Sequence, residues 1–130
     1  MIKETITYKD FNGHERTEDF YFNFTEQELA EMNWSTAGGL DQLYQDIVQA
    51  EDGEQVVKVF KKLIMDSYGK KTPDGRGFVK TEEILLDFVS TNAFSDLFMR
   101  LASDDKEAAR FFNGVLPDSL KDNKLSAVGK

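Results

Sequence analysis

The stretch Thr17-Glu-Asp-Phe-Tyr-Phe-Asn-Phe-Thr-Glu-Gln-Glu-Leu-Ala-Glu-Met32 changes its hydrophobic period in the middle. Before Thr25, phenylalanine stands at every second position, which is the pattern of a strand with one buried face. From Thr25 onward the pattern is helical, because Thr25 and Glu28 form a capping box. The sequence therefore predicts an α+β, mostly α fold. An N-terminal antiparallel β-hairpin at 2–24 is followed by five or six short helices within 25–117.

The first strand of the hairpin is predicted in Ile2-Lys-Glu-Thr-Ile-Thr-Tyr8, whose apolar residues are even-numbered. Those of the second strand, Phe20, Phe22 and Phe24, are also even-numbered. To share one buried face, even residues must pair with even residues, so the loop between the strands holds an odd number of residues. We expect the three-residue loop Phe11-Asn12-Gly13, with its glycine in the left-handed region as a G1 bulge.

The helical part continues in several amphipathic segments. The strongest stripe consists of Val56, Val57, Phe60, Leu63, Ile64 and Tyr68, and Gly69 follows it as a predicted helix stop. Further helices are expected at 40–48, 81–89, 92–101 and 103–115. The carboxylate pairs Glu82-Glu83 and Asp104-Asp105 stand at predicted helix starts, where negative charge favours the positive end of the helix dipole.

Length and composition are those of one small acidic domain. The chain has 130 residues and no cysteine, which excludes disulfides and cysteine-ligated zinc. A formal net charge of −8 argues against a nucleic-acid partner and favours a partner that is neutral or basic where the two meet. The sequence has neither the apolar run of a signal peptide nor the roughly 20 apolar residues of a membrane span. We expect one domain over 1–117 and a polar, mobile tail at 118–130.

Residue types that carry catalysis are scarce in this chain. The only histidine is His14, which falls in the predicted hairpin turn and has no partners for a Ser-His-Asp or Cys-His arrangement. Gly75-Arg-Gly77 lacks the spacing and the following Lys-Ser/Thr of a phosphate-binding loop. We therefore predict no catalytic residue, no cofactor and no metal. The lysine pairs at 61–62 and 70–71 are interpreted as solvated surface.

Aromatic side chains are abundant, and most of them must form the core. The chain has 11 phenylalanines, 4 tyrosines and 1 tryptophan. Large side chains that the regular stripes need least are candidates for an exposed partner-binding patch. We predict such a patch from Trp34, Phe98, Met99 and Phe111. The same reasoning allows Phe98 to be a core residue, because it also belongs to the stripe of the 92–101 helix.

Three groups of segments carry a family resemblance. They are Asn12-Gly13 with Phe20-Tyr-Phe-Asn-Phe-Thr25; Tyr68-Gly-Lys70 with Thr72-Pro-Asp-Gly-Arg76; and Ala93-Phe-Ser-Asp-Leu-Phe-Met99 with Phe112-Asn-Gly-Val-Leu-Pro117. Together they span about residues 3–117. In pattern and order they resemble the tail assembly chaperones of long-tailed bacteriophages, the siphophages that infect Gram-positive hosts.

The resemblance implies a non-enzymatic partner-binding protein without nucleic-acid or membrane contacts. Its partner would be the tape measure protein, which it would keep soluble until tail tube subunits polymerise around it. Copies would self-associate along this cargo, and the tail tube protein is a second candidate partner. The resemblance also implies a location in the host cell cytoplasm and absence from the mature virion. Two alternatives stay open: another tail structural protein, such as a tail terminator or connector subunit, and a small enzyme, which has the least support.

Overall fold

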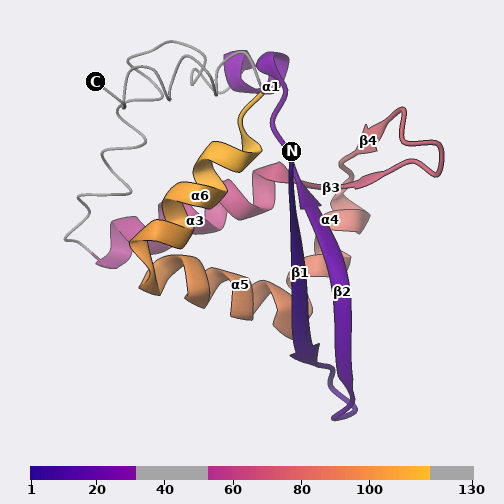
Figure 1. Ribbon diagram of the computed structural model, residues 1–130, viewed down its shortest axis with the longest axis vertical. Helices are drawn as coiled ribbons and strands as arrows, with labels where there is room; N and C mark the ends of the chain where they lie inside the picture. Colours follow the sequence, from indigo (N-terminus) through magenta and orange to yellow (C-terminus); the bar gives the residue numbers. More distant parts are fainter. Residues whose placement is uncertain (32–52, 118–130) are drawn as a thin grey trace.

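The fold begins with a long β-hairpin that lies beside the helices (Figure 1). The computed structural model describes residues 1–31 and 53–117. Strands β1 (Ile2–Lys9) and β2 (Glu15–Phe22) pair antiparallel, from Ile2 opposite Phe22 to Lys9 opposite Glu15. Even residues thus face even residues, as the sequence predicted. The buried side chains are Glu4, Ile6, Tyr8, Phe20, Phe22 and Phe24.

The hairpin turn has the predicted three-residue loop. The backbone N–H of Gly13 donates to the carbonyl of Asp10 at 3.0 Å, and that of Asp10 donates to the carbonyl of His14 at 2.8 Å. Gly13 has a φ of 82°, the left-handed conformation that a G1 bulge requires. The Asp10 carboxylate also accepts hydrogen bonds from the backbone N–H groups of Asn12 and His14, both at 2.9 Å. The turn therefore fixes the register that buries the aromatic face.

The helices of the described residues are α1 (Glu26–Glu31), α3 (Gly53–Ser67), α4 (Glu82–Val89), α5 (Asn92–Ser103) and α6 (Asp105–Val115). The capping box is confirmed, since the Glu28 N–H donates to Thr25 Oγ1 at 3.2 Å and the Thr25 N–H donates to Glu28 Oε1 at 2.9 Å. The Ile84 N–H donates to Thr81 Oγ1 at 3.1 Å, which caps α4 as expected. Asp104 likewise caps α6.

Two short strands extend the sheet and correct one prediction. β3 (Tyr68–Lys71) pairs with the end of β2, and β4 (Phe78–Val79) pairs with β3, giving the order β1-β2-β3-β4. Gly69, which the sequence suggested as a helix stop, lies in β3 opposite Tyr21. Glycine is needed here because a larger residue has no room. A Cβ at this position would lie 2.7 Å from the ring of Phe78 and 2.9 Å from the Val79 carbonyl oxygen.

The core lies between the hairpin and the helices. Phe60 and Ile64 of α3 are 3% and 0% exposed, which confirms their predicted burial. Phe88 of α4 stacks on Tyr68 with ring centres 4.3 Å apart. Val57, which the sequence placed in the same stripe as Phe60, is 48% exposed, so that part of the prediction is wrong.

Lys80 joins four segments at the open end of the hairpin. Its Nζ donates to the carbonyl of Asn23 at 2.7 Å, to Glu28 Oε2 at 2.6 Å and to the carbonyl of Asp66 at 2.9 Å. These acceptors lie after β2, in α1 and at the end of α3. The ammonium group also lies 5.0 Å from the ring centre of Phe24. One side chain thereby holds the hairpin exit against the helices.

Some predictions concern residues outside the described part of the chain. They are the helix expected at 40–48, the partner-binding role of Trp34 and the polar tail at 118–130. The assignment of 1–117 to a single domain also stays a prediction.

Candidate protein-interaction site

The described residues contain no cluster of three or more histidine, aspartate or glutamate side chains that could hold a metal ion. Within the same ranges, no helix is long and apolar enough to cross a membrane. His14 is exposed in the hairpin turn. The candidate sites in the described part of the molecule are therefore surfaces that could contact other molecules.

Phe111 does not lie on a surface, so the prediction that it forms an exposed contact is wrong. Its side chain is 0% exposed, and its ring centre lies 5.1 Å from that of Phe22 in an edge-to-face arrangement. The physical reason can be read from α6 itself. Ala108, Phe111, Phe112 and Val115 stand at positions i, i+3, i+4 and i+7, which form one buried helix face.

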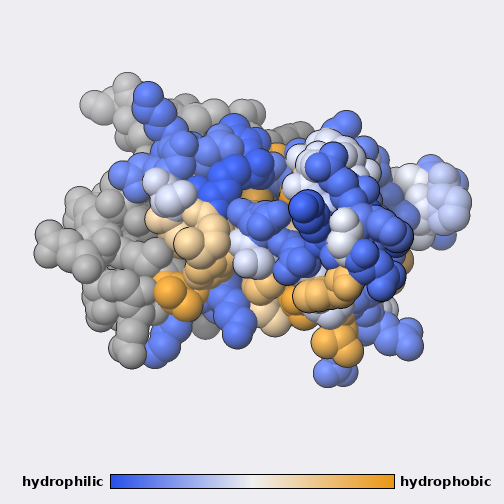
Figure 2. All heavy atoms as spheres, turned by 90° about the horizontal axis from the view of Figure 1, so that it is seen from below, coloured by the Kyte–Doolittle hydropathy of each residue, from blue (hydrophilic) through white to orange (hydrophobic). Residues whose placement is uncertain are grey.

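Met99 is the predicted contact residue that the structure leaves most accessible. It is 59% exposed on α5, while the neighbouring Phe98 is partly buried against the core. Leu86 on α4, which the sequence did not suggest, is 64% exposed. Figure 2 views the molecule from the end where the hairpin turns and shows apolar side chains in separate areas among hydrophilic ones. No continuous apolar patch is visible on that face.

A groove opens where β2 and β3 separate. The two strands pair only at Tyr21–Gly69 and Phe22–Tyr68, after which β3 turns away to pair with β4. The space between them has a volume of about 410 Å³ and extends to Asp87 of α4. A second hollow of about 360 Å³ continues toward the hairpin turn and shares Glu18, Phe20 and Asp87 with the first. The side of β2 that faces α4 is thus hollow from Tyr21 toward the hairpin turn.

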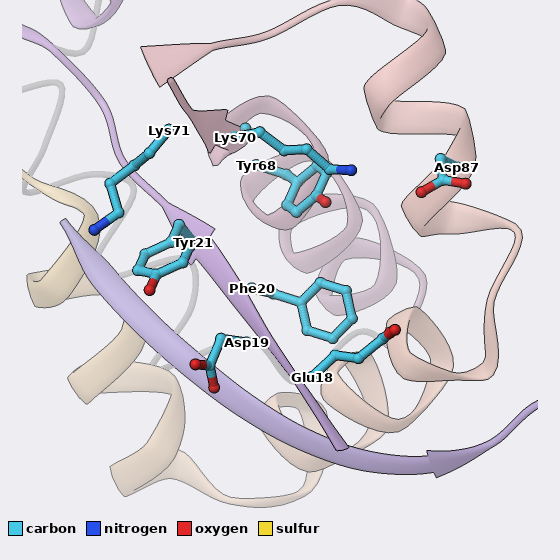
Figure 3. Close-up of a pocket in the computed structure, with 9 residues that line it drawn as sticks. Glu18, Asp19, Phe20, Tyr21, Tyr68, Lys70, Lys71 and Asp87 are labelled. Carbon is cyan, nitrogen blue, oxygen red and sulfur yellow. The ribbon is translucent and has the colours of Figure 1, made fainter. Parts of the chain in front are cut away.

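Side chains on the two faces of β2 differ in what they reach. Figure 3 shows the groove residues on two sides of the strand, with Glu18, Phe20, Tyr68, Lys70 and Asp87 on one side. Asp19, Tyr21 and Lys71 lie on the other side and also line the groove. There the Nζ of Lys71 lies 4.3 Å from the ring centre of Tyr21.

The pKa values of two tyrosines show the effect of burial and negative charge around the groove. The pKa of Tyr68 is raised to about 12, first by burial and then by the negative charges of Asp87 and Glu18. The pKa of Tyr8 is also raised to about 12, first by burial and then by its hydrogen bond to Glu18. Both hydroxyl groups resist ionisation first because they are buried and second because carboxylates lie close by.

The opposite side of the hairpin is closed by a charge network that sequence analysis missed. Glu4 of β1 is only 4% exposed, and its carboxylate accepts hydrogen bonds from Arg100 and Arg110, the latter at 2.7 Å. Arg110 also donates to Glu107 at 2.9 Å. Glu4 has an even number, like the buried apolar residues of β1, so the strand pattern contained the signal for its burial.

The described residues thus form an α+β fold with a groove beside β2 and exposed apolar side chains on α4 and α5. A family model described as phage tail assembly chaperone matches residues 1–127. The chain therefore belongs to the phage tail assembly chaperone family. This is a family of non-enzymatic assembly helpers, so the protein is not an enzyme. Searches of curated proteins and of solved structures found no match.

Proposed function

We propose that this chain binds the tape measure protein of a long-tailed phage and keeps it soluble until tail tube subunits polymerise around it. The observation that carries the proposal is the family match over residues 1–127, which makes the chain a tail assembly helper and favours this role over a tail terminator or connector. A tape measure is a very long chain with apolar helical faces, and such faces aggregate unless they are covered. The resemblance of the sequence further supports a siphophage of a Gram-positive host.

The proposed contact surface combines exposed side chains of two neighbouring helices. Met99 of α5 and Leu86 of α4 are the large apolar residues that these helices leave most exposed, and Phe98 lies partly accessible beside Met99. Methionine and leucine suit a helical cargo, because a flexible thioether adapts to different apolar partners. Trp34, which lies outside the described residues, remains a candidate partner-binding residue.

The proposed role has consequences for stoichiometry and location. One small domain covers only a short part of a long cargo, so several copies would bind along each tape measure and contact one another. The tail tube protein would meet these copies when it replaces them. We place this exchange in the host cell cytoplasm and expect the chaperone to be absent from the mature virion.

Co-expression tests the proposal directly. The tape measure protein is produced with the wild-type chain, with Met99→Asp or with Lys61→Glu, and its soluble fraction is measured. Met99→Asp should abolish most of the rescue, because a charge would be buried against an apolar cargo. Lys61→Glu serves as the control, since Lys61 is exposed on α3 outside the proposed surface. Rescue by the wild type should persist in about half-molar salt, because screening weakens exposed ion pairs and leaves apolar burial intact.

Three results would contradict this function. The wild-type chain could fail to bind any tape measure fragment, or rescue could vanish in high salt. Rescue could also survive charge insertion at Leu86, Phe98 and Met99 together. An ordered ring of the chain alone in solution would instead favour a connector subunit.

A further inference from the structure

We propose that the free edge of β2 at Glu15–Asp19 binds an extended, lysine- or arginine-bearing segment of a partner protein as an added strand. This surface lies on the sheet, whereas the proposed cargo surface lies on α4 and α5. The inference does not depend on the identity of the cargo.

The backbone of β2 offers unused hydrogen-bonding groups along this edge. The Asp10–His14 bond and the antiparallel register direct the N–H and C=O groups of even residues in β2 toward β1. The N–H and C=O groups of odd residues in this strand therefore point away from β1. The hydrogen bond from the Asn23 N–H to the Ser67 carbonyl, at 2.8 Å, confirms this direction. Because β3 pairs with β2 only at Tyr21 and Phe22, the outward groups of Glu15, Thr17 and Asp19 have no partner among the described residues.

The space beside this edge accommodates a polypeptide. The hollow of about 410 Å³ lies beside β2 from Glu18 to Tyr21, where β3 leaves it. The hollow of about 360 Å³ continues toward the hairpin turn below Arg16, Glu18 and Phe20, on the side of β2 that faces α4. An incoming strand would continue the line of β3 and place alternate side chains above Phe20 and between Glu18 and Asp87 (Figure 3). An edge that is merely protected from aggregation needs charged residues but no such hollow.

The charged side chains around the groove indicate which kind of partner segment would bind there. The edge and the groove carry the carboxylates of Glu15, Glu18, Asp19 and Asp87, and the ammonium groups of Lys70 and Lys71 line the end of the groove formed by β3. The guanidinium of Arg16 lies 2.8 Å from Asp10 and 3.7 Å from Glu18, so it is already engaged by carboxylates of this chain. Basic side chains on both faces of an added strand would therefore meet negative charge.

The same charges disfavour a second copy of this chain. Two β2 edges paired antiparallel about Thr17 would set Glu15 of one copy opposite Asp19 of the other at both ends. Like charges directly opposite each other destabilise a strand pair. The outer edge of β1 is a poorer site, because the Lys9 carbonyl already accepts a hydrogen bond from Asn92 at 2.9 Å.

The test uses the full chain and a short probe peptide in which lysine alternates with threonine and valine. Amide NMR titration should show the largest shifts at Thr17 and Asp19, and it gives the affinity. A peptide with glutamate in place of lysine should bind at least about tenfold more weakly, since attraction becomes repulsion. A lysine peptide with methyl groups on the backbone nitrogens that face β2 should also lose most of its binding, because it cannot form the ladder.

Paired variants separate backbone from charge. Thr17→Pro removes an outward N–H without touching the β1 ladder and should weaken binding about fivefold or more, whereas Thr17→Ala keeps the N–H and should bind as the wild type does. Asp87→Lys should weaken binding, while Asp96→Lys on α5 changes the net charge equally and should not. Thermal melts confirm that each variant is folded.

The N-methyl peptide keeps the test decisive even if Thr17→Pro fails to fold, because it is measured on the wild-type chain. Equal binding of the methylated and unmethylated peptides would overturn the proposal. So would shifts centred on Thr5 and Thr7, which would place the peptide at β1. Absence of binding, or a concentration-dependent dimer that uses the same amides, would overturn it as well.

Discussion

On the β1 side of the hairpin, the buried carboxylate of Glu4 accepts hydrogen bonds from Arg100 and Arg110, whereas on the β2 side the carboxylates of Glu18 and Asp87 face a groove. Both sides begin from the same two strands. On the first side α5 and α6 supply cations and cover the strand. On the second side β3 leaves β2 after two residue pairs, and no described residue takes its place.

If the proposed strand binds beside β2, one hairpin serves stability on one side and binding on the other. A buried carboxylate is tolerated only when it is paired, so the β1 side ties the hairpin to two helices. The β2 side retains backbone groups and charges that solvent satisfies and that a partner can use instead. Stability is expected to depend on the first side and on the aromatic core behind it, and much less on the second.

The largest expected effect contrasts two phenylalanines. Phe111→Ala removes a ring that is 0% exposed and contacts Phe22, so we expect a loss of about 3–5 kcal/mol in the free energy of unfolding. Phe11→Ala removes a ring that is 81% exposed at the hairpin turn and should cost less than about 0.5 kcal/mol. Urea unfolding measures both losses. Similar losses would mean that the turn packs against something else in solution.

A smaller effect is expected at the charge network. Glu4→Gln keeps the shape of the side chain but removes the charge that Arg100 and Arg110 share, and we expect a loss of about 1–3 kcal/mol. The loss is moderated because the two arginine side chains are 38% and 45% exposed.

Glu107→Gln is the matched control for Glu4→Gln and should cost less. The Glu107 side chain is 30% exposed. The distance from its Oε1 to Arg100 Nε is 3.6 Å, which is beyond hydrogen-bond distance. A larger loss for Glu107→Gln than for Glu4→Gln would show that the network is anchored on α6 and not on the hairpin.

Much of the hairpin could be predicted because its determinants are local. The apolar residues of both strands are even-numbered, and this determined which residues pair. Asn12-Gly13 determined the position of the loop. The helix starts were equally local, since Thr25, Thr81 and Asp104 cap helices through residues two or three positions away.

The missed features depend on contacts between distant segments. Gly69 is a glycine because Phe78 and Val79 lie over it, and nothing in its neighbours distinguishes that from a helix stop. Arg100 and Arg110 stand 96 and 106 positions from Glu4, so the sequence does not reveal the pairing. The burial of Phe111 was different, because the spacing of Ala108, Phe111, Phe112 and Val115 along α6 contained the signal for it.

The effect that is smallest at neutral pH appears only at alkaline pH and concerns the groove. Tyr8 and Tyr68 have pKa values of about 12 in the folded protein, against an ordinary value of 10.0. The unfolded chain therefore loses these protons at lower pH than the folded chain does. The contribution of both tyrosines to stability is complete below pH 10 and decreases as pH rises toward about 12.

A variant of Glu18 separates the effect of burial from the effect of nearby negative charge on these pKa values, since the charge of Glu18 acts on both tyrosines. Glu18→Gln should lower both pKa values, but burial should keep them above the ordinary value, because burial is the largest cause in each case. Glu107→Gln, on the β1 side, should leave the tyrosines unchanged. Tyrosinate absorbance followed against pH measures the ionisation, and melts at the same pH values measure the stability. If Glu18→Gln left both titrations where they were, the groove would not carry the negative field on which the binding of a basic strand rests.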